Sequence, residues 1–172
     1  FNIAIEGNFD DCQNLVKSMF ADKEFSNSIN MSGVNSINWA RIIAQTVYYF
    51  YTYFSLQKKQ LINFSVPTGN FGDVYAGYLS KKMGLPINKL IVATNQNDIL
   101  HRAISKGKYE MKTVSETISP SMDIQIASNF ERLIYDLNNF DDVKTKNIMN
   151  KINKEGKYSI PKDNLNKISK DF

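Results

Sequence analysis

Residues 65–86 read SVPTGNFGDVYAGYLSKKMGLP, and this stretch decides the fold. An apolar run over residues 61–67, typical of a strand, leads into a short loop with two glycines and then into a helix predicted over about residues 72–83. Gly84 suits the end of that helix, and Pro86 prevents its continuation. A strand that passes through a glycine loop into a helix begins a β-α-β unit, which favours an α/β fold with a parallel sheet.

The loop TGNFGD is a candidate anion-binding site. Gly69 and Gly72 lack side chains, which permits a close approach of the backbone to a ligand, and the start of the next helix presents free N–H groups. The alternative is a tight turn whose glycines serve packing alone. The stretch matches neither the G-x-x-x-x-G-K-S/T of a Walker loop nor the G-x-G-x-x-G of a dinucleotide fold, so its spacing does not name the anion. Asp73 would repel a phosphate, and we expect it to accept backbone N–H bonds at the helix start.

The elements before and after this unit fit the same fold. We expect a strand over residues 1–6, a helix after it with Asn8 as its cap, and a loop or short strand over residues 22–34. A long helix is predicted from about residue 37 to 56. Residues 89–95 form a continuous apolar run, as buried parallel strands do.

The second half of the chain is predicted to be mainly helical. A helix is expected over residues 98–105, and another over about residues 129–138. Ser128 stands three residues before Glu131, which is the spacing of a capping box. The tail from Asp141 is expected to be helical and solvated.

Charge is distributed unevenly along a chain of ordinary globular composition. Of the 172 residues, 42% are hydrophobic, which is enough for a sizeable core. The formal net charge is +4, but residues 144–172 hold eight lysines and three acids, a net of +5, so residues 1–143 sum to −1. We interpret the tail as a solvated lysine-rich helix or linker, because a nucleic-acid patch would include arginines and interleaved aromatic residues.

Several classes of protein find no support in the sequence. Cys12 is the only cysteine, so no disulfide can form within the chain, and a reducing, cytoplasmic location is expected. No signal peptide is visible. Arg41, Gln45 and several tyrosines interrupt the apolar run over residues 39–56, which favours a buried helix over a membrane span. His101, the only histidine, has no companion ligands at a metal-binding spacing.

A second polar cluster lies in VNSINWAR, residues 34–41. Asn35 or Ser36 is expected to cap the following helix, and Asn38 and Arg41 lie within one helical turn, so both can face one side. The planar guanidinium of Arg41 suits a pair of phosphate oxygens. Taken alone, the cluster is better explained by helix capping and a surface arginine.

Five segments of the chain together resemble a known family. They are EGNFDDCQ, NSINWARIIAQ, VPTGNFGDVYAGYLSKKMGLP, VATNQND and SPSMDIQIASNFERLIYDL. In this order, and at this spacing from Ala4 to about Leu137, they closely resemble threonine synthase. The third and fifth segments are the most specific. The resemblance implies an α/β, three-layer parallel-sheet fold of the tryptophan-synthase-β-like kind (fold type II), incomplete in this chain.

The resemblance also implies a function. Such enzymes are lyases that use pyridoxal 5′-phosphate to convert O-phospho-L-homoserine and water into L-threonine and phosphate, the last step of threonine biosynthesis. They must hold two phosphates at once, one on the cofactor and one on the substrate. Family likeness assigns the cofactor phosphate to Gly69, Asn70, Phe71 and Gly72. It assigns the substrate phosphate to Asn35, Ser36 and Arg41, with Asn38 as a supporting partner.

The same resemblance indicates what residues 1–172 lack. The Schiff-base lysine is expected upstream, and the residue that faces the pyridine nitrogen downstream, so no catalytic residue is expected here. The chain would need the rest of its own polypeptide, and alone it is expected to be inactive. Residues 1–31 would belong to a small domain, residues 32–140 to the centre of the large cofactor-binding domain, and residues 141–172 to a lysine-rich helical extension. Cys12, His101 and SPSMDI gain no role.

Two alternatives stay open. A non-catalytic phosphate- or nucleotide-binding α/β module needs one anion site only. A related pyridoxal-phosphate lyase, of the dehydratase or cysteine synthase type, needs no grip on a substrate phosphate. No metal, nucleic-acid or membrane partner is expected.

Overall fold

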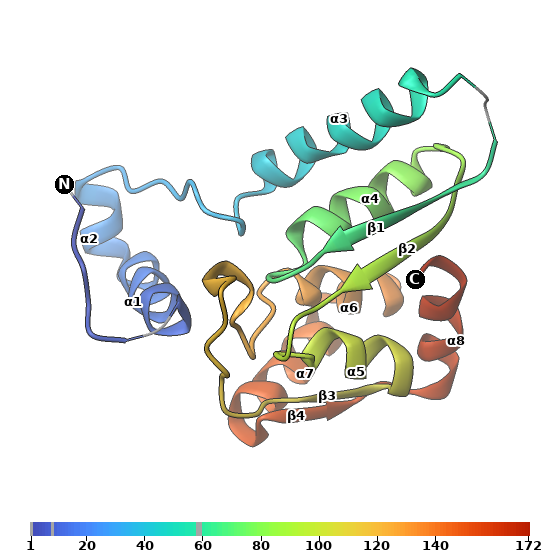
Figure 1. Cartoon of the computed structure of the whole chain (residues 1–172). Coiled ribbons are helices and arrows are strands. Elements are labelled where there is room, and N and C mark those ends of the chain that lie inside the picture. Colours follow the sequence, from blue (N-terminus) through green and yellow to red (C-terminus); the bar gives the residue numbers. More distant parts are fainter. Residues whose placement is uncertain (1, 8, 58–59) are drawn as a thin grey trace.

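The computed structural model describes residues 2–7, 9–57 and 60–172 and shows a mixed α/β chain (Figure 1). The expected cap Asn8 lies outside these residues. The elements, in chain order, are α1 (Phe9–Ala21), α2 (Lys23–Ser28), α3 (Trp39–Ser55), β1 (Ile62–Pro67), α4 (Gly72–Lys82), β2 (Ile87–Ala93), α5 (Ile99–Lys106), β3 (Lys108–Glu110), the 3-10 helix η1 (Pro120–Met122), α6 (Phe130–Leu137), α7 (Asp142–Glu155), β4 (Lys157–Ser159) and α8 (Lys162–Asp171).

β1, α4 and β2 form the predicted β-α-β unit. The two strands pair in parallel, from Ile62 opposite Ile87 to Pro67 opposite Ala93. Because they are parallel, their carboxyl ends meet at one edge, where the Thr68 N–H donates to the carbonyl of Ala93 over 2.8 Å. The segments that follow the two strands therefore start side by side.

α4 ends as the sequence predicts. Its last turn is closed by the Gly84 N–H, which donates to Lys81 O, and by the Leu85 N–H, which donates to Ser80 O. Gly84 has a φ of +101°, a conformation in which a residue with a Cβ would be strained. This glycine turns the chain from α4 into β2.

α3 and α4 pack unusually closely at Gly77. A Cβ at this position would lie 2.6 Å from the ring of Tyr49 in α3 and 2.8 Å from Leu90 in β2. The Tyr49 hydroxyl also donates to the backbone carbonyl of Asp73 over 2.7 Å, and burial raises the pKa of this tyrosine. The first turn of α4 is therefore held against the middle of α3.

α3 buries one face and exposes the other. Ile42, Thr46, Tyr49 and Tyr53 face the core, whereas Trp39, Ile43, Val47 and Tyr51 are exposed. The expectation of a buried helix is correct for the first face alone. Among the described helices, none is both long enough and apolar enough to cross a membrane.

The start of α3 differs from the prediction. The cap is Asn38, whose side-chain oxygen accepts from the Ala40 N–H over 2.9 Å, and neither Asn35 nor Ser36 caps the helix. Asn35 instead accepts from the N–H of Ile37, which closes the turn before the helix. The helix consequently begins at Trp39.

The N-terminal region also departs from expectation. Residues 2–6 form no strand, because they are exposed and no partner strand lies beside them in the described part of the chain. Residues 22–34 contain α2, whose cap is Asp22; its carboxylate accepts from the Phe25 N–H over 3.0 Å. The polar composition of that segment favours a loop, so this short helix was not predicted from the sequence.

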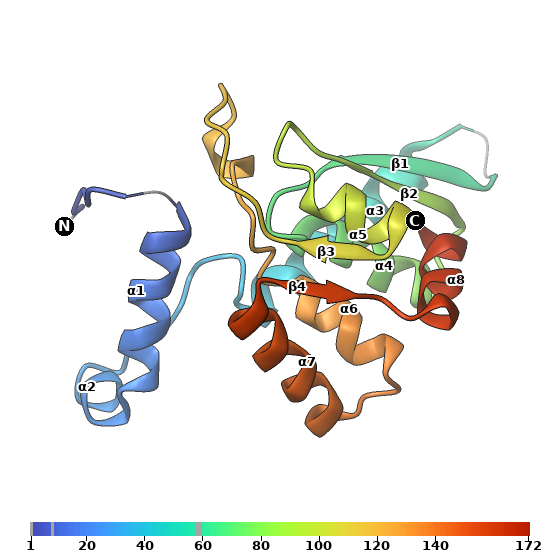
Figure 2. The ribbon, with the colours of Figure 1, turned by 90° about the horizontal axis from the view of Figure 1, so that it is seen from below.

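α1 and α2 stand apart from the other elements and are joined to them by residues 29–38 (Figure 2). The Ser128 hydroxyl donates to the side-chain oxygen of Gln13 in α1 over 3.1 Å. Ser128 therefore does not form the predicted capping box with Glu131, because its hydroxyl is used in this distant contact.

The lysine-rich tail is largely helical and mostly exposed, as expected, but it also packs against the rest of the chain. β4 pairs antiparallel with β3, and Ile152, Ile160 and Ile168 of the tail are buried in the core. The lysines of α7 and α8 are exposed together with most of the other polar residues of these helices, so the charge count indicates the solvated face alone.

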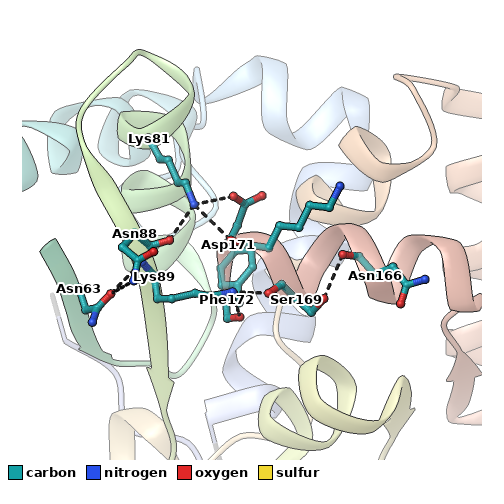
Figure 3. A network of polar contacts seen from close by, with 9 residues as sticks. Asn63, Lys81, Asn88, Lys89, Asn166, Ser169, Asp171 and Phe172 are labelled. Carbon is teal, nitrogen blue, oxygen red and sulfur yellow. Dashed lines mark hydrogen bonds and ion pairs between the residues drawn. The ribbon is translucent and has the colours of Figure 1, made fainter. Parts of the chain in front are cut away.

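Two lysines from the β-α-β unit hold the C-terminal end of α8 (Figure 3). Lys81 lies 2.7 Å from the Asp171 carboxylate, and Lys89 donates to the carbonyls of Ser169 and Phe172. Cations near the carbonyl end of a helix stabilise it. The Phe172 ring stacks on Tyr78 of α4 at 5.6 Å between centroids, so the tail is anchored to the same helix that follows the glycine loop.

Substituting Gly77→Ala tests the close contact of α3 and α4. We expect the free energy of unfolding to fall by about 1–3 kcal/mol, because the methyl group would overlap the Tyr49 ring. Gly33→Ala is the control, since its Cβ would meet nothing closer than 3.4 Å. Equal stability of the two variants in urea unfolding would show that α3 can move away from α4 at little cost.

Candidate functional site

The glycine loop is bent by a strained residue, Phe71. Its φ of 67° is left-handed, which is uncommon for a residue other than glycine. Its side chain is fully buried and packs against Phe130 at 5.3 Å and Phe172 at 5.7 Å between ring centroids. The aromatic core therefore fixes a backbone conformation that the chain would not adopt on its own.

The bend leaves a row of unused donors. The backbone N–H groups of Gly69, Asn70, Phe71 and Gly72 donate to no acceptor in the described part of the chain. Three of them precede α4 directly, and the fourth begins it, so they lie at the positive end of the helix dipole. Such an array suits an anion, and a phosphate group fits it.

The two glycines of the loop serve protein packing. A Cβ on Gly69 would lie 2.8 Å from the carbonyl oxygen of Ser121, and a Cβ on Gly72 would lie 3.0 Å from Ile42 and 3.1 Å from Asn129. The glycines are thus required by neighbouring segments of the chain. The unused N–H groups, and not the missing side chains, indicate the ligand.

Asp73 behaves as expected at the start of α4. Its carboxylate accepts from the Val74 N–H over 2.8 Å and is held at the helix N-terminus. Burial raises the pKa of Asp73, and the hydrogen bond from Val74 offsets part of that rise.

The segment over residues 34–41 places its polar groups before and in the first turn of α3. Arg41 is exposed, and its Nη1 donates to the carbonyl of Val34 over 3.2 Å, which orients the guanidinium over this segment. Its other guanidinium nitrogens have no hydrogen-bond partner among the described residues. Asn38, predicted as a supporting partner, caps α3 and donates to the carbonyl of Gly33.

Asn129 brings the two predicted clusters together. Its side-chain N–H donates to the carbonyl of Ser36 over 3.0 Å, and its backbone N–H donates to the carbonyl of Asn70 over 3.1 Å. Arg132, one turn further along α6, donates to the carbonyl of Ile37 over 2.8 Å. The sequence does not single out Asn129, because an asparagine before a helix is common; its burial to 1% exposure is the structural signal.

The segment SPSMDI, which gained no role from the sequence, forms the wall beside Gly69. Asp123 anchors it by accepting from the Thr117 N–H over 2.7 Å, the Thr117 hydroxyl over 2.7 Å and the Asn95 side chain over 2.7 Å. Asn97 donates to the same carboxylate. Burial raises the pKa of Asp123, but these hydrogen bonds outweigh it, and the net pKa lies below its ordinary value.

The remaining candidates lie outside this arrangement. His101 and Cys12 are exposed on α5 and α1. No group of three or more His, Cys, Asp or Glu residues that could hold a metal occurs among the described residues. An open cavity of about 940 Å³ between α4, α6 and α7 is lined by Tyr75, Arg132 and Thr145, among others, but by none of the predicted phosphate-binding residues.

Several known proteins that are similar to this chain are threonine synthases. No protein-family model matches the chain. The threonine synthase of Pseudomonas aeruginosa is 52% identical over 160 residues, which is 92% of this chain and 34% of that protein. The crystal structure of the PLP-bound threonine synthase from Brucella melitensis matches 98% of this chain and 37% of its own, at 54% identity and a TM-score of 0.86. The yeast threonine synthase structure matches 99% and 36%, at 47% identity and a TM-score of 0.81.

The fold is therefore that of the α/β pyridoxal-phosphate proteins of fold type II, and it is incomplete in this chain. Within that class, the chain belongs to the threonine synthase family, as its five sequence segments predicted. It spans about a third of the length of the curated relatives that it matches.

Asp123→Asn tests the anchoring of the loop wall. A depressed pKa means that the stabilisation from Asp123 is fully present above the unfolded-state value of about 3.9 and is lost as the pH falls through the lower folded-state value. We expect the variant to unfold more easily than wild type at pH 7, with the difference shrinking towards pH 2. Urea unfolding across this range measures it, with the exposed Asp163→Asn as control. A difference that does not change with pH would contradict the assignment.

Proposed function

We propose that the complete protein is a threonine synthase that converts O-phospho-L-homoserine and water into L-threonine and phosphate, with pyridoxal 5′-phosphate as cofactor. The observation that carries this proposal is the pairing of two polar segments through Asn129, one with unused N–H groups and the other with Arg41. A protein that binds one phosphate has no need of the second segment. Family membership supports the same conclusion.

The glycine loop is proposed to hold the cofactor phosphate. The donors would be the backbone N–H groups of Gly69, Asn70, Phe71 and Gly72, assisted by the positive end of α4. When bound, the cofactor supplies the electron sink that makes protons on the substrate carbon atoms removable. The loop contributes orientation: a rigid row of donors fixes the phosphate end and therefore the direction of the ring.

Asn35, Ser36 and Arg41 are proposed to hold the substrate phosphate. As the bond between Cγ and the bridging oxygen breaks, negative charge grows on the departing phosphate. A guanidinium whose remaining donors have no partner among the described residues is suited to neutralise that charge. Asn38 contributes indirectly, because it caps α3 and thereby sets the position of Arg41.

The lysine that carries the cofactor is proposed to lie outside residues 1–172. Lys81 and Lys82, which follow the glycine loop most closely, are paired with Asp171 and Asp136 at 2.7 Å each.

We also propose the division into residues 1–31 as part of a small domain, 32–140 as the centre of the large domain and 141–172 as its extension; the separate position of α1 and α2 supports the first boundary (Figure 2).

We further propose a cytoplasmic protein that acts on a small molecule and binds neither nucleic acid nor membranes. The single cysteine and the near-neutral charge of residues 1–143 support this. The rest of the same polypeptide is proposed as a partner that completes the site.

The reaction itself is the direct test. The complete protein, loaded with cofactor, should release inorganic phosphate and form L-threonine in equal amounts from O-phospho-L-homoserine. Binding of a nucleotide without turnover would favour a non-catalytic module. Activity on unphosphorylated amino acids alone would favour a related lyase of the dehydratase type.

Arg41→Ala should lower kcat/KM for O-phospho-L-homoserine at least ~10-fold in the complete protein. The reason is the loss of a charged hydrogen bond of about 1.5–3 kcal/mol to the substrate phosphate. Lys106→Ala, which removes an exposed cation at the end of α5, is the matched control and should leave kcat/KM unchanged. An unchanged kcat/KM for Arg41→Ala would remove this residue from the site.

A further inference from the structure

Asn129 is a buried polar residue that lies between the two proposed phosphate-binding segments, residues 35–37 and the glycine loop. It is 1% exposed and lies just before α6. Its side-chain nitrogen donates to Ser36 O over 3.0 Å and would lie 3.1 Å from a Cβ on Gly72. One side chain therefore touches the segment before α3 and the first residue of α4.

Arg132 completes this connection from the same helix. Its Nε donates to the side-chain oxygen of Asn129 over 3.0 Å, and its Nη2 donates to Ile37 O over 2.8 Å. Its guanidinium also lies over the ring of Trp39, 5.1 Å from the centroid, where a cation is attracted to the aromatic face. The arginine thus fixes both the orientation of Asn129 and the start of α3.

The position of these contacts matters because the segments that they join are turns. Residues 35–37 precede α3 and residues 69–71 precede α4, and a turn between elements is generally more mobile than the elements themselves unless other contacts hold it. A buried amide whose donor and acceptor are both used holds its partners in one geometry, since any shift would leave buried polar groups without partners.

We propose that Asn129 is a positioning residue that holds the substrate-phosphate segment at a fixed separation from the cofactor-phosphate loop. This inference rests on the function proposed above and deepens it. The substrate is joined to its own phosphate by a short chain, so its reacting carbons meet the cofactor only when the two phosphate sites have the correct spacing. Asn129 sets that spacing without touching either phosphate.

The test compares Asn129→Ala with Asn138→Ala in the complete, cofactor-loaded protein. Asn138 is a buried asparagine at the other end of α6, and its side chain donates to Ile134 O over 2.8 Å, so its removal also costs a buried hydrogen bond. Both variants should lose thermal stability. Only Asn129→Ala should raise KM for O-phospho-L-homoserine, by about tenfold.

Asn129→Asp is the second variant, in case alanine prevents folding. It keeps the volume of the side chain and an acceptor for Arg132 but cannot donate to Ser36 O, so it should also raise KM. Combining Asn129→Ala with Arg41→Ala should raise KM less than the product of the single effects, because the displaced segment has already lost its main phosphate ligand.

The outcomes separate the two proposals. An active wild type in which KM for Asn129→Ala and Asn129→Asp matches that of Asn138→Ala overturns the positioning role and leaves the proposed function standing. A wild type that releases no phosphate from O-phospho-L-homoserine overturns the proposed function and this inference with it. A KM increase confined to the Asn129 variants and non-additive with Arg41→Ala supports both.

Discussion

The left-handed backbone of Phe71 is the constraint on which the rest of the site depends. A residue with a side chain in this conformation costs roughly 1–2 kcal/mol. Burial of the ring offsets that cost, since a fully buried phenylalanine contributes about 1.5–3 kcal/mol, and its edge-on contact with Phe130 adds to this. The hydrophobic core thereby stabilises a bend that leaves four N–H groups without acceptors among the described residues.

The same core binds the distant parts of the chain to this bend. Phe130 begins α6 directly after Asn129, and Phe172 follows α8, so the ring of Phe71 is packed by residues from the middle and the end of the second half of the chain. The packing of the aromatic core therefore determines the geometry of the site. A substitution that loosens the packing of these aromatic rings would change the backbone conformation of the loop, although no aromatic ring needs to contact a ligand.

The sequence predicted the local features well, because they depend on neighbours in the chain. The strand, glycine loop and helix of residues 65–86 need only their own residues, and Gly84 ends α4 as expected. The contacts of Asn129 could not be predicted from the sequence, because its partners Ser36 and Asn70 lie 93 and 59 positions away. The cap at Asn38 and the helix α2 were missed because several neighbouring side chains can cap a helix. The packing of the tail was missed because it depends on contacts with distant elements.

The proposed function requires that the loop and the Arg41 segment hold two separate phosphate groups. A crystal structure of the complete protein with pyridoxal 5′-phosphate and inorganic phosphate measures this directly. We predict that the cofactor phosphate lies within about 3 Å of the N–H groups of Gly69 to Gly72, with a second phosphate at the guanidinium of Arg41. A cofactor phosphate bound elsewhere, or a second phosphate that does not contact Arg41, would rule out this pair of sites.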